Sequence, residues 1–145
     1  MEALEISRSG LDVEWRRLEI IASNLANMQT TRTGDGGSYI PLRLVSGPVE
    51  NFRRILAQEQ ASEPPAHPKG VRVYGVEAQD AAVRQVYEPG HPHADPQGFV
   101  TYPAISHAEE MSLMIKTTRA YEANLVAMAA AQQIYSSALQ LGRQS

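Results

Sequence analysis

The residues best suited to chemistry are two histidines and an aspartate within one short turn. His91, His93 and Asp95 alternate along the segment PGHPHAD, and an extended chain places alternate side chains on one side, as a metal site requires. No further cluster of histidines or carboxylates with ligand spacing accompanies them in the sequence. We therefore expect a proline-rigid turn with solvated polar groups, and keep a small metal-dependent enzyme using these three residues as one alternative.

Other candidate groups have simpler interpretations. Glu109 and Glu110 are adjacent, so on a helix they point in different directions and cannot form a facing acid–base pair. Segment 33–38 (TGDGGS) is glycine-rich but lacks the lysine and flanking strand of a phosphate-binding loop. The chain has no cysteine, which excludes a thiol nucleophile, a thiolate metal site and a disulfide. The sequence predicts no catalytic, cofactor or metal site, and hence a protein that is not an enzyme.

Composition excludes several further classes of protein. The 145 residues carry a net charge of −3, whereas a nucleic-acid binder usually has a basic surplus on one face. No run approaches the 18 apolar residues of a membrane span. The first ten residues contain two acids and no apolar core of signal-peptide length, so we expect no cleaved secretory signal.

The distribution of helix-breaking residues divides the chain into three parts. All nine prolines lie between residues 41 and 103, and eight of the ten glycines lie between 34 and 98. Because proline breaks helices and glycine weakens them, the sequence predicts an α+β protein. We expect its three parts to be an N-terminal helix in 1–33, a small β-rich middle domain in 34–103 with a proline-rich loop near 58–69, and a long C-terminal helix in 104–145.

Both terminal parts have the apolar spacing of paired helices. In the first, leucines recur every seven residues, with Trp15, Ile21 and Ala22 beside them, at Leu4, Leu11, Leu18 and Leu25. In the last, two rows with the same spacing continue for over four heptads, namely Met111, Thr118, Leu125, Gln132 and Leu139, and Met114, Tyr121, Met128 and Tyr135. So long a helix cannot bury its stripe within its own short chain. We expect the two helices to pair as a coiled coil, and other copies or other chains to cover the rest.

The segment RAYEAN in the middle of the last helix is unusual. Arg119 and Glu122 have the spacing of a helical ion pair. Asn124 is a poor helix former, and a hydrogen bond to a neighbouring helix would explain it. These residues favour a contact between subunits.

The middle part reads as short strands. Segment 39–45 contains a proline, which suits an edge strand. The valines of 71–76 indicate a second strand, with 83–87 as its expected partner, and 99–102 indicates another short strand.

Several motifs together resemble the flagellar rod and hook protein family. The N-terminal motif is IIASNLAN at 20–27, followed by TTRT at 30–33. The C-terminal motifs are Glu109-Glu110-Met111, Met114-Ile115 and RAYEAN at 119–124. The middle adds TRT at 31–33 with Gly36, Gly37 and Tyr39, then YEPGHP at 87–92, Ala94-Asp95 and GFV at 98–100, which resemble the proximal-rod members.

This resemblance implies a structural subunit of the bacterial basal-body proximal rod. Its terminal helices would assemble into the helical axial drive shaft that transmits torque, and its middle domain would lie outside. The implied partners are other copies, the rod proteins FlgB, FlgF and FlgG, the rod-base and MS-ring junction proteins FliE and FliF, and the flagellar type III export apparatus. No nucleic acid or small-molecule substrate is implied. The implied location is the periplasmic rod, reached without a cleaved signal peptide, and the lack of cysteine suits that passage.

The candidate assembly interface combines residues of both helices. They are Leu11, Trp15, Leu18, Ile21, Asn24, Leu25, Asn27, Met114, Arg119, Tyr121, Glu122, Asn124, Leu125, Met128 and Tyr135. Two further alternatives remain at this point. One is a soluble coiled-coil adaptor with a β insert, and the other is a distal rod or hook subunit, against which the short chain argues.

Overall fold

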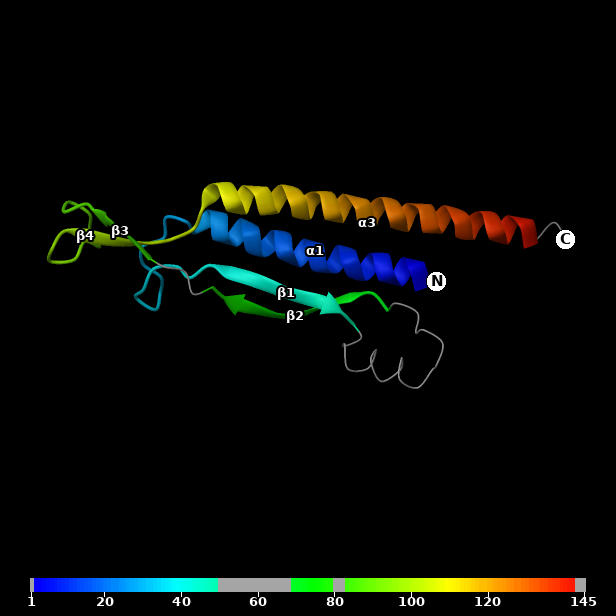
Figure 1. Cartoon of the computed structure of the whole chain (residues 1–145), viewed down its shortest axis with the longest axis horizontal. Helices are drawn as coiled ribbons and strands as arrows, with labels where there is room; N and C mark the ends of the chain where they lie inside the picture. Colours follow the sequence, from blue (N-terminus) through cyan, green and yellow to red (C-terminus); the bar gives the residue numbers. More distant parts are fainter. Residues whose placement is uncertain (1, 50–68, 80–82, 143–145) are drawn as a thin grey trace, which may run out of the picture. The chain divides into compact units, whose positions relative to one another are not determined.

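The computed structural model describes residues 2–49, 69–79 and 83–142. The element order is α1 (Glu2–Ala26), β1 (Leu42–Pro48), β2 (Val71–Ala78), β3 (Val83–Tyr87), β4 (Phe99–Pro103) and α3 (His107–Gly142) (Figure 1). The α+β prediction, with a long helix in each terminal part, is confirmed. Nearly all of the predicted proline-rich loop near 58–69 lies outside the described residues.

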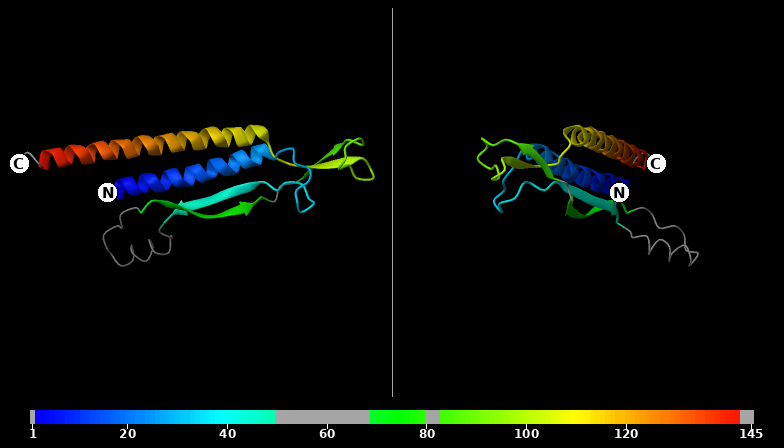
Figure 2. Two further views of the ribbon diagram at one scale, coloured as in Figure 1. Left: turned by 180° about the vertical axis from the view of Figure 1, so that it is seen from behind. Right: turned by 60° about the vertical axis from the view of Figure 1, so that its left-hand side comes forward.

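The chain packs as two units, which we describe separately. The first unit comprises 1–16, 45–75 and 118–145, and the second comprises 17–44 and 76–117. In each unit a part of α1 lies beside a part of α3, as the views of Figures 1 and 2 agree. Each unit therefore combines the two terminal helices with a piece of the middle.

Local sequence explains where the helices begin and end. Helix α1 carries acids in its first turn, where the helix dipole favours them. After Ala26, the Asn27 side chain donates to the Ser23 carbonyl at 2.9 Å and turns follow. Ser106 caps α3, because its hydroxyl accepts the Glu109 amide at 3.4 Å. At 36 residues, α3 is about 54 Å long.

The strands form two separate two-stranded sheets. Strand β1 pairs with β2, and β3 pairs antiparallel with β4 from Val83↔Pro103 to Tyr87↔Phe99. The expected pairing of 71–76 with 83–87 is therefore wrong. Its reason is visible at the end of β2, where the Gln79 amide donates to the Pro41 carbonyl at 2.8 Å and continues the pairing with the β1 side. Strand β1 begins at Leu42, because the hydroxyl of Tyr39 is instead bonded to α1.

A turn built around Asp95 closes the β3–β4 hairpin. The Asp95 carboxylate accepts the amides of Gln97 at 2.9 Å and Phe99 at 2.8 Å. Gly98 has φ of 87°, a left-handed conformation that side chains with a Cβ adopt at a cost. A Cβ at this position would also lie 2.8 Å from Tyr87 Cε2. The hairpin therefore requires glycine at position 98.

Replacing Gly98 by alanine is expected to lower the free energy of unfolding by about 1–2 kcal/mol, from left-handed strain and the contact with Tyr87. Urea unfolding of the purified chain measures this. Gly90→Ala is the matched control, because a Cβ there meets no atom within 4 Å. An equal effect of the two substitutions would contradict the assigned role of Gly98.

The buried core of each unit is small. In the second unit Ile21 and Val100 are almost fully buried, and Val13 is the buried aliphatic residue of the first unit. Many large apolar side chains remain exposed among the described residues, most of them on α3, β2 and β3. None of the helices among the described residues is long and apolar enough to cross a membrane.

Candidate assembly interface

In the first unit, α1 and α3 approach closely at a glycine. A Cβ at Gly10 would lie 2.6 Å from the Asn124 amide oxygen, so the close contact depends on the missing side chain. The Asn124 side-chain nitrogen donates to the Ala120 carbonyl of its own helix at 2.9 Å. One turn away, the rings of Trp15 and Tyr121 lie 6.4 Å apart. The two helices run antiparallel, since residues 10 and 15 of α1 meet 124 and 121 of α3.

The face of α3 toward its own chain differs from the predicted one. The row of Met114, Tyr121 and Met128 is half-buried, as expected for a helix interface. The second row is Glu110, Thr117, Asn124 and Ala131, one residue before the predicted positions at each heptad. Its members are polar or small because they meet a glycine in the first unit and a buried asparagine in the second. The predicted Leu125 lies outside this face and is 47% exposed.

The C-terminal half of α3 presents apolar side chains to solvent. Their exposed fractions range from 47% to 71%, at Leu125, Val126, Ile134, Tyr135, Leu139 and Leu141. No charged residue occurs from Ala123 to Gly142. An apolar surface this long is typical of a site of protein–protein contact.

The second unit contains a buried polar cluster centred on Asn24. This side chain is fully buried, and its oxygen accepts the Tyr39 hydroxyl and the Leu42 amide, both at 3.0 Å. Its nitrogen donates to the Leu42 carbonyl at 2.9 Å and to Glu110 Oε2 at 3.4 Å. All four hydrogen-bonding positions of the amide are thus used. Asn24 holds the end of α1, the start of β1 and the first turn of α3 together.

Glu110 extends this cluster to an arginine. Its side chain is 2% exposed, and its Oε1 lies 2.5 Å from Arg43 Nη2. A buried carboxylate is stable only where a cation and hydrogen bonds compensate its lost hydration. Arg43 and Asn24 supply these, so Glu110 has a structural role. Its partner Arg43 reaches it from β1.

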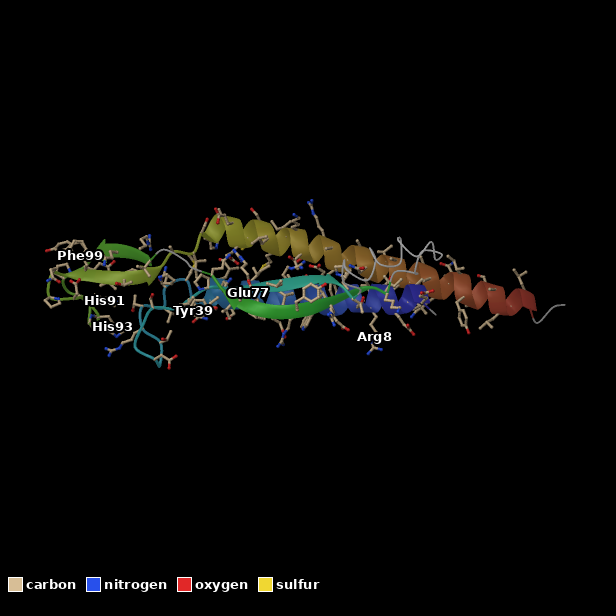
Figure 3. The ribbon with its side chains drawn as sticks, turned by 60° about the horizontal axis from the view of Figure 1, so that its bottom comes forward. Arg8, Tyr39, Glu77, His91, His93 and Phe99 are labelled. Carbon is tan, nitrogen blue, oxygen red and sulfur yellow. The ribbon has the colours of Figure 1, made fainter. Side chains whose placement is uncertain are left out.

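The three residues of the predicted metal alternative are engaged within their own turn and its neighbour. His93 Nδ1 lies 2.8 Å from the Thr31 hydroxyl, and the His93 amide donates to His91 Nδ1 at 3.0 Å. The two rings lie side by side with centroids 5.3 Å apart (Figure 3). Asp95 closes the hairpin as described above. Within the described ranges no three histidine, cysteine or acidic side chains gather as a metal site.

An acidic neighbour affects the tyrosine beside this turn. The Tyr102 hydroxyl donates to Glu88 Oε2 at 3.1 Å. Desolvation raises the pKa of Tyr102, and the hydrogen bond and charge of Glu88 raise it further. This pair, like the histidines, stabilises the hairpin end of the second unit.

The predicted interface residues fall into three groups by exposure. Ile21 and Asn24 are buried within the chain. Half-buried positions are Leu11, Leu18, Leu25, Asn27, Met114, Tyr121, Asn124 and Met128. Exposed positions are Trp15, Arg119, Glu122, Leu125 and Tyr135. Neither Arg119 nor Glu122 makes an ion pair with any residue in the described part of the chain.

The sequence analysis missed four residues of these contacts. Gly10 lies in a helical pattern, where a glycine that costs stability signals a close approach. Glu110 was interpreted only as a dipole-favoured acid. Arg43 and Tyr39 gave no signal, because nothing in their local sequence shows that they meet α1 and α3.

Comparison with known protein families agrees with both helices. The model of the flagella basal body rod protein matches residues 4–32, and the model of the flagellar basal body rod FlgEFG protein C-terminal region matches residues 97–141. These matches cover most of α1, all of β4 and nearly all of α3. The two terminal helices therefore define a flagellar basal-body rod protein.

Curated relatives narrow this class. The flagellar basal-body rod protein FlgC of Bacillus subtilis is 34% identical over 97% of both chains. That of Borreliella burgdorferi is 31% identical over 94% of this chain and 93% of its own. That of Escherichia coli O6:H1 is 30% identical over 99% and 98%. The chain belongs to the FlgC family of flagellar basal-body rod proteins, which are structural rod subunits.

Proposed function

We propose that this chain assembles through α1 and α3 into the proximal part of the flagellar rod, where it transmits torque as part of the axial drive shaft. The observation that supports this most is the exposed, uncharged apolar surface of α3 from Ala123 to Gly142. Burying such a surface stabilises association by about 25 cal/mol per Å² of apolar area. The proposed contacts between subunits are the interface residues predicted from the sequence, with Ile134, Leu139 and Leu141 added.

The specific partners and the route follow from the family and are part of the proposal. They are other copies of the chain, the rod proteins FlgB, FlgF and FlgG, and FliE and FliF at the rod base. The chain would leave the cell through the flagellar type III export apparatus without a cleaved signal and act in the periplasm. Residues 34–103 would form the domain outside the tube of helices.

A single charge on the exposed surface of α3 tests this proposal. Leu139→Asp is expected to abolish swimming in a host strain that lacks its own copy, because the carboxylate would be buried between subunits. Within the chain, Leu139 is 53% exposed, so we expect its free energy of unfolding to change by less than about 0.5 kcal/mol. Swimming in soft agar, and recovery of the tagged chain in purified basal bodies, are the measurements.

The neighbouring Gln140→Asp is the matched control. It places the same charge one residue away, at an exposed polar position, and should retain swimming. If Leu139→Asp swims as well as Gln140→Asp, the assigned assembly surface is wrong.

A further inference from the structure

The first unit carries a groove on the side of α1 away from α3. The groove measures about 500 Å³, and its apolar lining is Val13 of α1 with Val71 and Val73 of β2. Figure 1 shows α1 between α3 and the β1–β2 strands within this unit. Val71 and Val73 are still 37% and 38% exposed. An apolar surface therefore remains at the junction of α1 and β2.

The periodicity of α1 explains why its own α3 does not cover this groove. Gly10 and Trp15 both touch α3, which places the face between them toward that helix. Positions 9, 12, 13 and 16 follow each other at helical spacing on the other side of α1. On this side the Ser9 hydroxyl accepts the Val71 amide at 3.0 Å. Another chain must therefore supply whatever fills the groove.

The rim of the groove carries charges of both signs. Asp12 and Arg16 stand one turn apart on α1, and Arg72 stands on β2. Arg72 also lies over the Tyr74 ring at 5.3 Å. Asp12 makes no ion pair with any residue in the described ranges. A matching partner needs apolar side chains beside one base and one acid.

The outer face of α3 has this composition. Glu122, Leu125, Val126 and Ala129 follow each other at i, i+3, i+4 and i+7, and are therefore on one face. All four are exposed, and Arg119 stands three residues before Glu122. This face is opposite the row of Thr117, Asn124 and Ala131, which lies toward the chain itself.

We propose that the face of α3 around Glu122, Leu125 and Val126 docks into the α1–β2 groove of a second copy of this chain. Leu125 and Val126 would meet the valines of the groove. Asp12 would pair with Arg119, and the arginines of the rim with Glu122. Because the two surfaces lie on different parts of one chain, the contact is heterologous and repeats from copy to copy. The inference rests on the proposed function and adds which surfaces meet.

Cysteine cross-linking tests the contact directly, because the chain has no cysteine of its own. Two tagged single-cysteine chains, Val73→Cys and Val126→Cys, are expressed together in a swimming host and treated with a short bismaleimide. A cross-linked dimer carrying both tags is expected in purified basal bodies. Ile134→Cys replaces Val126→Cys as the matched control, because the two native residues are 71% and 70% exposed. It should give at least tenfold less dimer.

A charge exchange covers the case in which a cysteine variant fails to assemble. Asp12→Arg and Arg119→Asp should each reduce swimming severalfold, and the two together should restore it. Absence of the Val73–Val126 dimer from rods that assemble and swim would overturn the inference and leave the proposed function intact. Additive defects in the exchange would also overturn it. Absence of the unmodified tagged chain from basal bodies would instead overturn the proposed function.

Discussion

Replacing Asn24 by alanine is expected to lower the free energy of unfolding by about 3–4 kcal/mol, the largest effect of any single side chain in the second unit. The substitution removes all four hydrogen bonds of the amide. It leaves the amide and carbonyl of Leu42 without their bonds to Asn24, beside the Tyr39 hydroxyl. Each hydrogen bond is worth about 1 kcal/mol net, and burying an unpaired group costs more.

Asn27→Ala is the matched control for this experiment. Asn27 is only half-buried and bonds to Ser23 and Thr30 within its own turn, so we expect a loss of about 1 kcal/mol. Urea unfolding followed by circular dichroism at 222 nm compares the two variants. Equal losses would show that the buried cluster contributes no more than an ordinary turn.

Replacing Glu110 by glutamine is expected to cost about 2–3 kcal/mol. Glutamine keeps the shape and can still accept from Asn24, but it removes the charge that faces Arg43. Breaking a buried pair by removing one charge costs about 3–5 kcal/mol. We lower this figure because the Arg43 side chain is 29% exposed and keeps some contact with water.

The adjacent acid serves as the control for the charge itself. Glu109→Gln changes the same charge at an exposed position in the same helical turn, and its effect should stay within about 0.5 kcal/mol. Combining Glu110→Gln with Arg43→Met should recover part of the loss, because no unpaired charge then remains. Strictly additive losses would mean that the pair contributes nothing as a pair.

The sequence predicted the helices well because their signals are local. Breakers confined to the middle, heptad spacing and a serine cap together specify α1 and α3 to within a few residues. The strand pairing could not be predicted in the same way. Segments 71–76 and 83–87 are close in sequence and apolar, yet β2 pairs with the distant β1 and β3 with β4.

The inner face of α3 illustrates the same limit. Hydrophobicity favours Leu125 over its neighbour, so the heptad pattern placed the leucine toward α1. The structure places Asn124 there, because Gly10 leaves room for a polar side chain. Likewise nothing local to Arg43 or Tyr39 reveals that they converge with Asn24 and Glu110. Such contacts depend on tertiary neighbours, which a pattern along one helix does not contain.

The uncharged surface from Ala123 to Gly142 also has a thermal consequence. Contacts between apolar groups near room temperature are driven by entropy, and they weaken on cooling. With no charges to be screened, such contacts respond little to ionic strength. Rods joined through this part of α3 would therefore be held more loosely in the cold than in warmth, and almost equally well in dilute and in salty surroundings.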